Sequence, residues 1–147
     1  MIQRSQATVI GLDYGAKRIG VARASVELAI AQPHMVLAND ANFFQKIISL
    51  IDKEEVQQIV VGLPRNLSGE DTKQTAEVRS FVRELRARVS IPVALQDEAG
   101  TSQKAQTELQ ARKSSAKKQR QTSAKTSIDA LAATYILEDF IAQGGLR

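Results

Sequence analysis

The chain contains no cysteine, only one histidine and few aromatic residues among its 147 positions. Without cysteine, disulfides, thiol catalysis and cysteine-based zinc sites are excluded. The lone His34 excludes a metal site built from several histidines, and we expect it to be a surface loop residue. An aromatic content of 4% argues against a base-stacking platform for single-stranded nucleic acid.

Long hydrophobic runs are also missing. No apolar stretch approaches the ~18 residues of a membrane span, and the polar residues 1–6 do not resemble a secretory signal. We therefore expect a cytoplasmic protein without a membrane partner. Its length and its hydrophobic fraction of 43% predict a single globular domain over residues 1–147. The formal charge of +4 modestly favours an anionic partner.

Strand-like and helix-like patterns alternate along the chain. Residues 9–22 read as two strands joined by a glycine turn, and Pro33 interrupts a third strand. That third strand is predicted at 28–37, and two more strands are predicted at 58–62 and 92–96. Helices are predicted at about 42–53, after the loop 63–69, and from Ser127 onward, with Asn39 or Asp40 capping the first of them. This order predicts an α/β protein in which three antiparallel strands lead into parallel ones.

Composition shifts only in the segment at about 112–126. Basic residues stand there among Ser, Ala, Gln and Thr without an acid: Arg112, Lys113, Lys117, Lys118, Arg120 and Lys125. We expect a mobile loop, either a solvated polar connector or an arm that neutralises the phosphates of a nucleic acid.

Acidic residues occupy the ends of three predicted elements. Asp13 ends the first strand, Asp97 and Glu98 follow the last strand, and Asp129 falls in the first turn of the final helix. Singly, each fits a turn former, a helix cap or an acid that interacts with the helix dipole. If they converge on one rim of the sheet, they repel unless Mg²⁺ or Mn²⁺ neutralises them. Convergence of these acids is therefore a hypothesis that the fold tests.

Four motifs occur in order along the chain. They are the glycine-rich strand pair 11–22 with Asp13, the Gly-Leu-Pro loop 62–69, the acidic pair 97–98, and Asp129 followed by small residues. This arrangement resembles the YqgF family of RuvX-like Holliday junction resolvases and pre-16S rRNA nucleases. In the third motif Ala99 stands where the family usually has Arg. We expect this departure to weaken substrate positioning more than metal binding.

The resemblance implies a ribonuclease H-like mixed five-stranded sheet, three antiparallel strands and then parallel ones, flanked by helices. It also implies a nuclease that hydrolyses phosphodiester bonds with one or two Mg²⁺ or Mn²⁺ ions. Their ligands are expected to be Asp13, Glu98 and Asp129, with Asp97 in reserve. Nucleic-acid contacts are expected from Lys17, Arg18, Arg65, Asn66, Lys117, Lys118 and Arg120, although each basic residue equally fits ordinary surface charge and Asn66 fits simple capping.

Substrate and assembly stay open at this point. The resemblance favours 5′-end processing of pre-16S rRNA in ribosome biogenesis, with the pre-ribosomal small subunit as a partner. A Holliday junction resolvase is the second possibility and requires a homodimer, because two symmetric cuts need two related sites. A precursor-trimming enzyme can act as a monomer. The chain also fits a non-catalytic RNA-binding assembly factor, and its short length disfavours an actin-like or sugar-kinase-like phosphotransferase.

Overall fold

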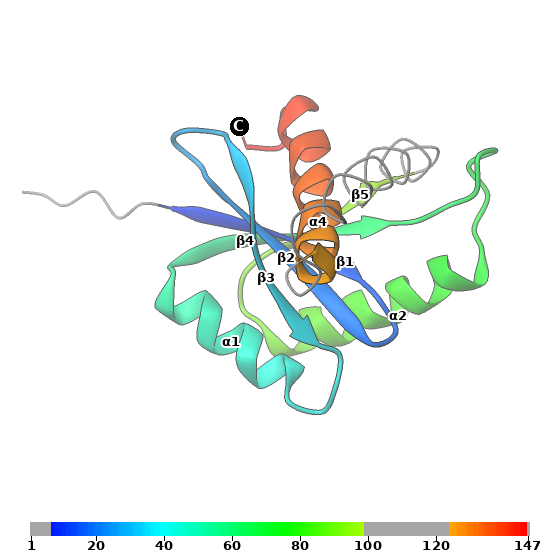
Figure 1. The fold of residues 1–147 in the computed structure, drawn as a ribbon, viewed down its shortest axis with the longest axis horizontal. Helices are drawn as coiled ribbons and strands as arrows, with labels where there is room; N and C mark the ends of the chain where they lie inside the picture. The colour runs from blue at the N-terminus through cyan, green and yellow to red at the C-terminus, as the bar shows by residue number, and fades with distance from the viewer. Residues whose placement is uncertain (1–6, 99–123, 147) are drawn as a thin grey trace, which may run out of the picture.

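A computed structural model describes residues 7–98 and 124–146, with side chains in the second range from Ile128 onward. Within these residues, five strands form one mixed sheet in the order β3-β2-β1-β4-β5 (Figure 1). The strands are β1 (Thr8–Tyr14), β2 (Arg18–Ser25), β3 (Ala31–Ala38), β4 (Val56–Leu63) and β5 (Val93–Asp97). The pairs β1–β2 and β2–β3 are antiparallel, whereas β1–β4 and β4–β5 are parallel. This arrangement confirms the sheet predicted from the sequence.

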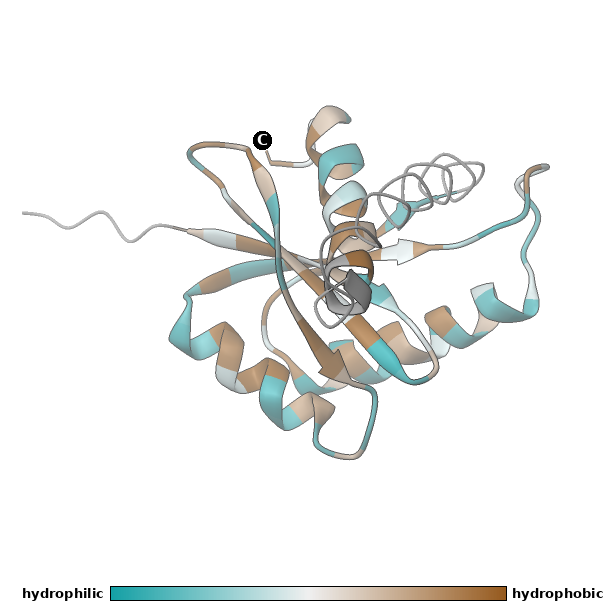
Figure 2. Ribbon diagram, in the orientation of Figure 1, coloured by the Kyte–Doolittle hydropathy of each residue, from teal (hydrophilic) through white to brown (hydrophobic). Residues whose placement is uncertain are grey.

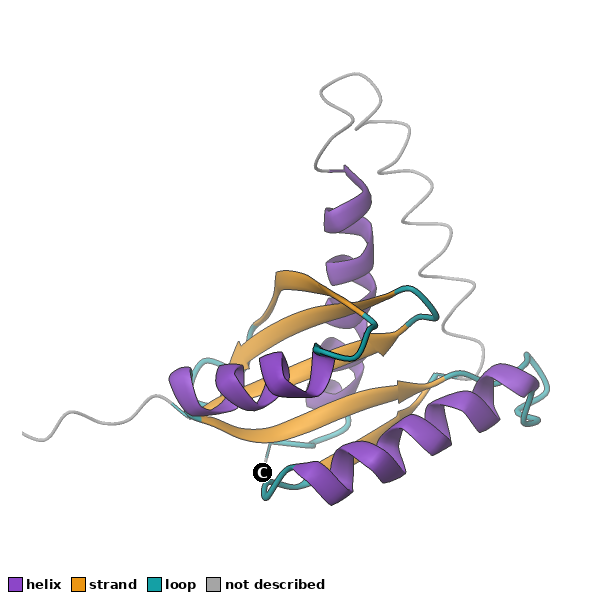
Figure 3. Ribbon diagram, turned by 90° about the horizontal axis from the view of Figure 1, so that it is seen from below, coloured by secondary structure: helices purple, strands orange, loops and turns teal. Residues whose placement is uncertain are grey.

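Helices cover both faces of the sheet. Helices α1 (Phe43–Lys53) and α2 (Lys73–Arg88) lie on one face, and α4 (Ala124–Ala142) crosses the other (Figure 3). Hydrophilic and hydrophobic residues alternate along α1 and α2, as expected for helices with one buried side (Figure 2). Among the described residues, no helix combines the length and apolarity that a membrane crossing requires.

Large apolar side chains fill the space between the sheet and the α1/α2 layer. Ile10 and Leu12 of β1 are fully buried on this face. Aromatic rings extend the core, since the ring centroids of Tyr14 and Phe81 lie 4.7 Å apart and those of Phe43 and Phe81 lie 5.6 Å apart. This layer therefore contains most of the bulky buried residues described in the structure.

Small residues line the opposite face, where α4 packs. A Cβ atom at Gly11 would lie 2.6 Å from Cγ of Leu137, and one at Gly62 would lie 2.5 Å from Cδ1 of Ile136. Such distances are too short for real contacts, so only glycine permits the helix to approach this closely. The glycines of the first two motifs thus bring α4 against the sheet backbone.

In the first half of the chain the predicted start of the third strand is wrong by three residues, and the predicted cap of the first helix is wrong. The third strand begins at Ala31, because the preceding turn contains Ala29 in a left-handed conformation with φ of 54°. Helix α1 has Asn42 as its N-cap. Asp40 instead accepts a hydrogen bond from the Asn42 backbone N–H at 2.9 Å, and Asn39 donates to the Gly15 carbonyl at 2.8 Å.

The final helix begins earlier than predicted. It starts at Ala124, so Ser127 lies inside α4 and is not its cap. Asp129 is then beyond the first turn, which removes the interpretation of this residue as a helix-dipole acid. Ala and Lys are strong helix formers, which explains why the end of the predicted basic loop is helical. The rest of that loop, 112–123, lies outside the described residues.

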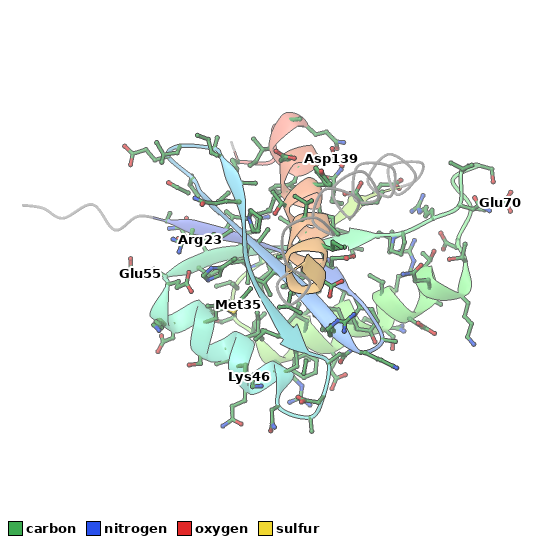
Figure 4. All side chains as sticks on the ribbon, in the orientation of Figure 1. Arg23, Met35, Lys46, Glu55, Glu70 and Asp139 are labelled. Carbon is green, nitrogen blue, oxygen red and sulfur yellow. The ribbon has the colours of Figure 1, made fainter. Side chains whose placement is uncertain are left out.

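His34 is not a surface loop residue. It lies partly buried on β3, where its Nε2 is 2.7 Å from Oε2 of Glu54. Arg23 approaches the other carboxylate oxygen of Glu54 at 3.1 Å. Arg23 and Glu55, the neighbour of Glu54, lie on the side of the molecule away from Glu70 in the β4–α2 loop (Figure 4). The ion-pair cluster is therefore remote from that loop.

Candidate functional site

Asp13 lies at the carboxyl end of the central strand, between two residues without side chains. It pairs with Gly20 of β2, and Gly62 of β4 lies one residue beyond Val61, the partner of Leu12. Because side chains alternate along a strand, Asp13 projects to the α4 face together with Gly11. The residue keeps partial solvent exposure, so this end of the sheet is accessible to an ion.

Asp129 reaches the same place from α4. A Cβ atom at Gly20 would lie 2.0 Å from the carbonyl oxygen of Asp129, so the helix backbone rests directly on this glycine. Since Gly20 is the sheet partner of Asp13, the packing of α4 places the two acids beside each other. The structure thus brings two of the predicted acids together, and their role as a site stays a prediction.

The electrostatics of Asp13 reflect this arrangement. Burial, followed by the negative charge of Asp129, raises the pKa of Asp13 from 3.8 to about 7. A carboxylate in such a position is stabilised by a proton or by a cation. Carboxylic acids with a strongly raised pKa are common at functional sites, although carboxylates in purely structural ion-pair networks also have shifted pKa values.

Arg18 supplies a positive charge to the pair. Its Nε donates a hydrogen bond to Oδ2 of Asp129 at 2.9 Å. Arg18 lies two residues before Gly20 on β2, so both project to the α4 face. The sequence predicts a phosphate contact for this arginine, whereas the structure pairs it with Asp129.

Asp97, the last residue of β5, and Glu98, the residue that follows it, lie on different sides of the sheet. Glu98 is buried, its backbone N–H donates to the Leu63 carbonyl at 3.0 Å, and its Cγ lies 3.5 Å from the position of a Cβ on Gly62. It therefore shares the face of Asp13. Asp97 faces the opposite way, with its Oδ2 3.4 Å from Nη1 of Arg65. Of the two, Glu98 is the better placed to join Asp13.

A metal site with three acidic ligands is not formed by the side chains as they stand. Within residues 7–98 and 128–146, no three acidic or histidine side chains come close enough together to hold one ion. Asp13 and Asp129 nevertheless fit a divalent cation, because they are hard oxygen donors and their mutual repulsion disfavours the metal-free state. Mg²⁺ is commonly held by only one or two carboxylates, with water and substrate phosphate completing its coordination.

The β4–α2 loop uses its polar residues to hold its own shape. Oδ1 of Asn66 accepts hydrogen bonds from the Glu70 N–H and the Ser68 hydroxyl, each at 2.8 Å. The N-cap of α2 is Thr72, so Asn66 does not stand at a helix N-terminus as predicted. Arg65 bridges Asp71 and Asp97, at 3.4 Å from each.

The remaining candidates fall into two groups. Lys17 is exposed in the β1–β2 turn, close in sequence to Asp13. Ala99 and the basic candidates Lys117, Lys118 and Arg120 lie outside the described residues. Sequence reasoning missed two contacts of the site, the seat of Asp129 on Gly20 and its pairing with Arg18. The only local signal for the first was the glycine itself.

Comparisons with known proteins agree on one family and one fold. A family model described as "RuvX: Holliday junction resolvase" matches residues 7–143. Relatives named "Putative pre-16S rRNA nuclease" include one from Maridesulfovibrio salexigens, 35% identical over 92% of this chain and 98% of its own length. Another, from Rickettsia typhi, is 39% identical over 88% and 81%.

Solved structures are similar to this chain in fold. Thermus thermophilus RuvC in complex with a Holliday junction substrate aligns with a TM-score of 0.55 and 16% identity, covering 93% of this chain and 96% of that one. A second RuvC structure from the same organism gives a TM-score of 0.52 at 12% identity. These similarities confirm the predicted ribonuclease H-like fold.

Proposed function

Because this chain belongs to the RuvX Holliday junction resolvase family, we propose that it is a divalent-metal-dependent nuclease that hydrolyses phosphodiester bonds. The observation that carries the proposal is the placement of Asp13 beside Asp129 at the carboxyl end of β1, where burial and repulsion raise the pKa of Asp13 to about 7. The RuvC-like fold and the relatives named as nucleases support the same reaction class.

In this proposal Asp13 and Asp129 hold the cation, and Glu98 joins them from the same face of the sheet. A bound Mg²⁺ or Mn²⁺ lowers the pKa of water and stabilises negative charge on a phosphate. The contribution of the chain is to keep the carboxylates on rigid elements and to release the proton of Asp13 when the cation binds. In this proposal Lys17, in the β1–β2 turn, and Arg18, the first residue of β2, attract the phosphate backbone.

We infer that the substrate is the 5′ end of pre-16S rRNA, bound with the pre-ribosomal small subunit in the cytoplasm. The relatives that share 35–39% identity carry pre-16S rRNA in their names, whereas the likeness to RuvC rests on 16% identity. A branched DNA junction is the alternative, because the family description names it. A monomer suits the first substrate, and a two-fold homodimer suits the second.

The test is cleavage of two substrates in Mn²⁺: a 5′-extended small-subunit rRNA fragment and a four-way DNA junction. We expect the wild-type chain to cut the RNA and Asp13→Asn to lose cutting, because the substitution removes an anionic ligand. Asp52→Asn serves as the matched control, since Asp52 is exposed on α1 and far from β1's carboxyl end. That variant should cut like wild type.

Different results would revise the proposal in distinct ways. Symmetric cutting of the junction by an obligate dimer that ignores the RNA would assign the DNA substrate. RNA binding without cutting, equal in wild type and Asp13→Asn, would indicate a non-catalytic assembly factor. In that case Ala99, in place of the family Arg, becomes the first position to restore.

A further inference from the structure

Arg18 forms an ion pair with Asp129, whose carboxylate the proposed function assigns to the divalent cation. Its Nε donates to Oδ2 of Asp129 at 2.9 Å, although the two residues are 111 positions apart in the sequence. The contact joins the start of β2 to α4 across the α4 face of the sheet. Two features position it: Gly20, on which the helix backbone rests, and the strand alternation that places Arg18 on that side.

The pair lies at the rim of the site and is not sealed in the core. The side chain of Arg18 is 42% exposed, and that of Asp129 is 28% exposed. A guanidinium carries five N–H donors, so Arg18 can hold Asp129 and still present donors to solvent. It can therefore exchange one anionic partner for another without unfolding either element.

We propose that Arg18 is the resident counter-ion of Asp129, displaced by a divalent cation and then taken up by a phosphate of the nucleic acid. The proposal rests on the proposed function, because it requires Asp129 to be a metal ligand. A dication and a guanidinium compete for the same oxygen, and the dication carries twice the charge. Once released, Arg18 faces the anionic substrate with a planar fork that matches phosphate oxygens.

This exchange makes metal binding and nucleic-acid binding depend on each other. Without nucleic acid, the cation must displace Arg18 from Asp129, and this competition lowers the affinity of the site for the cation. With nucleic acid present, the phosphate compensates Arg18 for the loss of Asp129, so the cation binds more tightly. Linkage requires the reverse effect to be equal: the cation must strengthen nucleic-acid binding by the same factor.

The first arm of the test measures Mn²⁺ binding to the full chain without nucleic acid, by electron paramagnetic resonance of free Mn²⁺. We expect Arg18→Gln to tighten Mn²⁺ binding about five-fold or more, because a competing cation is removed. Lys17→Gln is the matched control, since it removes the same charge from the neighbouring exposed residue. Its effect should be clearly smaller, because the control changes only the long-range field.

The second arm measures anisotropy of a labelled rRNA fragment with and without Ca²⁺, an oxygen-seeking cation used here to limit cleavage. For wild type we expect the affinity for RNA to rise when Ca²⁺ is added. Arg18→Gln should lose most of that rise, and Arg18→Lys should recover part of it, because lysine restores the charge without the planar fork. Lys17→Gln should weaken RNA binding equally with and without Ca²⁺.

Each failure has its own meaning. Unchanged or weaker Mn²⁺ binding in Arg18→Gln would overturn the counter-ion role while leaving the metal site in place. A Ca²⁺-dependent rise in RNA affinity that persists in Arg18→Gln would overturn the exchange onto phosphate. If wild type binds no Mn²⁺, or if Asp129→Asn binds it equally well, the metal assignment of the proposed function fails and the counter-ion proposal fails with it.

Discussion

The two faces of the sheet are built from different kinds of residue. The face under α1 and α2 carries branched side chains such as Ile10 and Leu12, and the helices pack large residues such as Phe43 and Phe81 against it. The face under α4 carries Gly11, Gly20 and Gly62, and the helix there rests on the sheet backbone. Apolar burial dominates the first face, and close approach of backbones dominates the second.

The difference separates stability from positioning. A face packed with large side chains buries the area that drives folding, and it tolerates small shifts because side chains can repack. A face packed backbone to backbone buries less area per residue but fixes the helix closely in register. Asp13 and Glu98 lie on this second face and Asp129 approaches it from α4, so the proposed site falls where the helix position is fixed by the backbone.

Phe43→Ala tests the first half of this comparison and should have the largest effect on stability. Phe43 is 1% exposed, so its truncation leaves a cavity and should lower the free energy of unfolding by about 4 kcal/mol. Urea unfolding at 25 °C measures the change. Cleavage per folded molecule should stay near the wild-type value. A folded variant without activity would show that the α1/α2 face also positions the site.

Gly20→Ala tests the second half. The added methyl group would lie 2.0 Å from the Asp129 carbonyl oxygen, so α4 must move away from the sheet. We expect a loss of about 3 kcal/mol in urea unfolding and a loss of cleavage even in the folded fraction.

Gly69→Ala is the comparison for that variant. Gly69 has a φ of +81°, and none of the described residues places an atom near its Cβ position, so only backbone strain of about 1 kcal/mol is expected. If Gly20→Ala behaves like Gly69→Ala, the seat of α4 on Gly20 is not what orders the acids.

Asp13→Asn tests the α4 face through the pH dependence of folding stability. An acid whose pKa rises from 3.8 to about 7 on folding costs no stability below pH 3.8, because it is protonated in both states. Between these values only the folded state keeps the proton, so stability falls as pH rises, and the loss is complete above about pH 7.

We therefore expect Asp13→Asn to stabilise the metal-free chain at pH 8 by about 2 kcal/mol, and to have little effect at pH 4. Thermal unfolding in a chelator across this pH range measures the difference. Asp52→Asn, on the exposed side of α1, should show no such pH dependence. A variant that is less stable than wild type at pH 8 would indicate a structural role for the Asp13 carboxylate.

The sequence predicted those parts of the molecule that local patterns determine. The strand pair around Asp13, the buried strand before Gly62 and the amphipathic face of α2 all follow from periodicity and glycine placement. The start of α4 was missed because Ser127 offered a side chain suited to capping, while Ala124 and Lys125 offered only helix propensity.

Contacts between segments far apart in the chain could not be predicted from the sequence pattern. Arg18 is a basic residue at the start of β2, and nothing near it in the sequence indicates that its partner is Asp129. His34 was similarly expected in a surface loop because its partner, Glu54, lies 20 residues further on, in the turn between α1 and β4. In both cases the partner depended on how distant segments pack, which no local pattern encodes. The roles of Asp13, Glu98 and Asp129 as ligands stay a prediction for the experiments above.

The separation of Arg18 and Asp129 by 111 positions has a consequence for the order of events during synthesis. The strand that bears Asp13 leaves the ribosome long before α4, and non-local contacts of this kind form late in folding. A nascent chain that ends before α4 has one carboxylate of the pair and lacks the helix that holds the other. If the mature protein cuts ribosomal RNA, the ribosome that makes it is not exposed to a finished site until translation has passed residue 129.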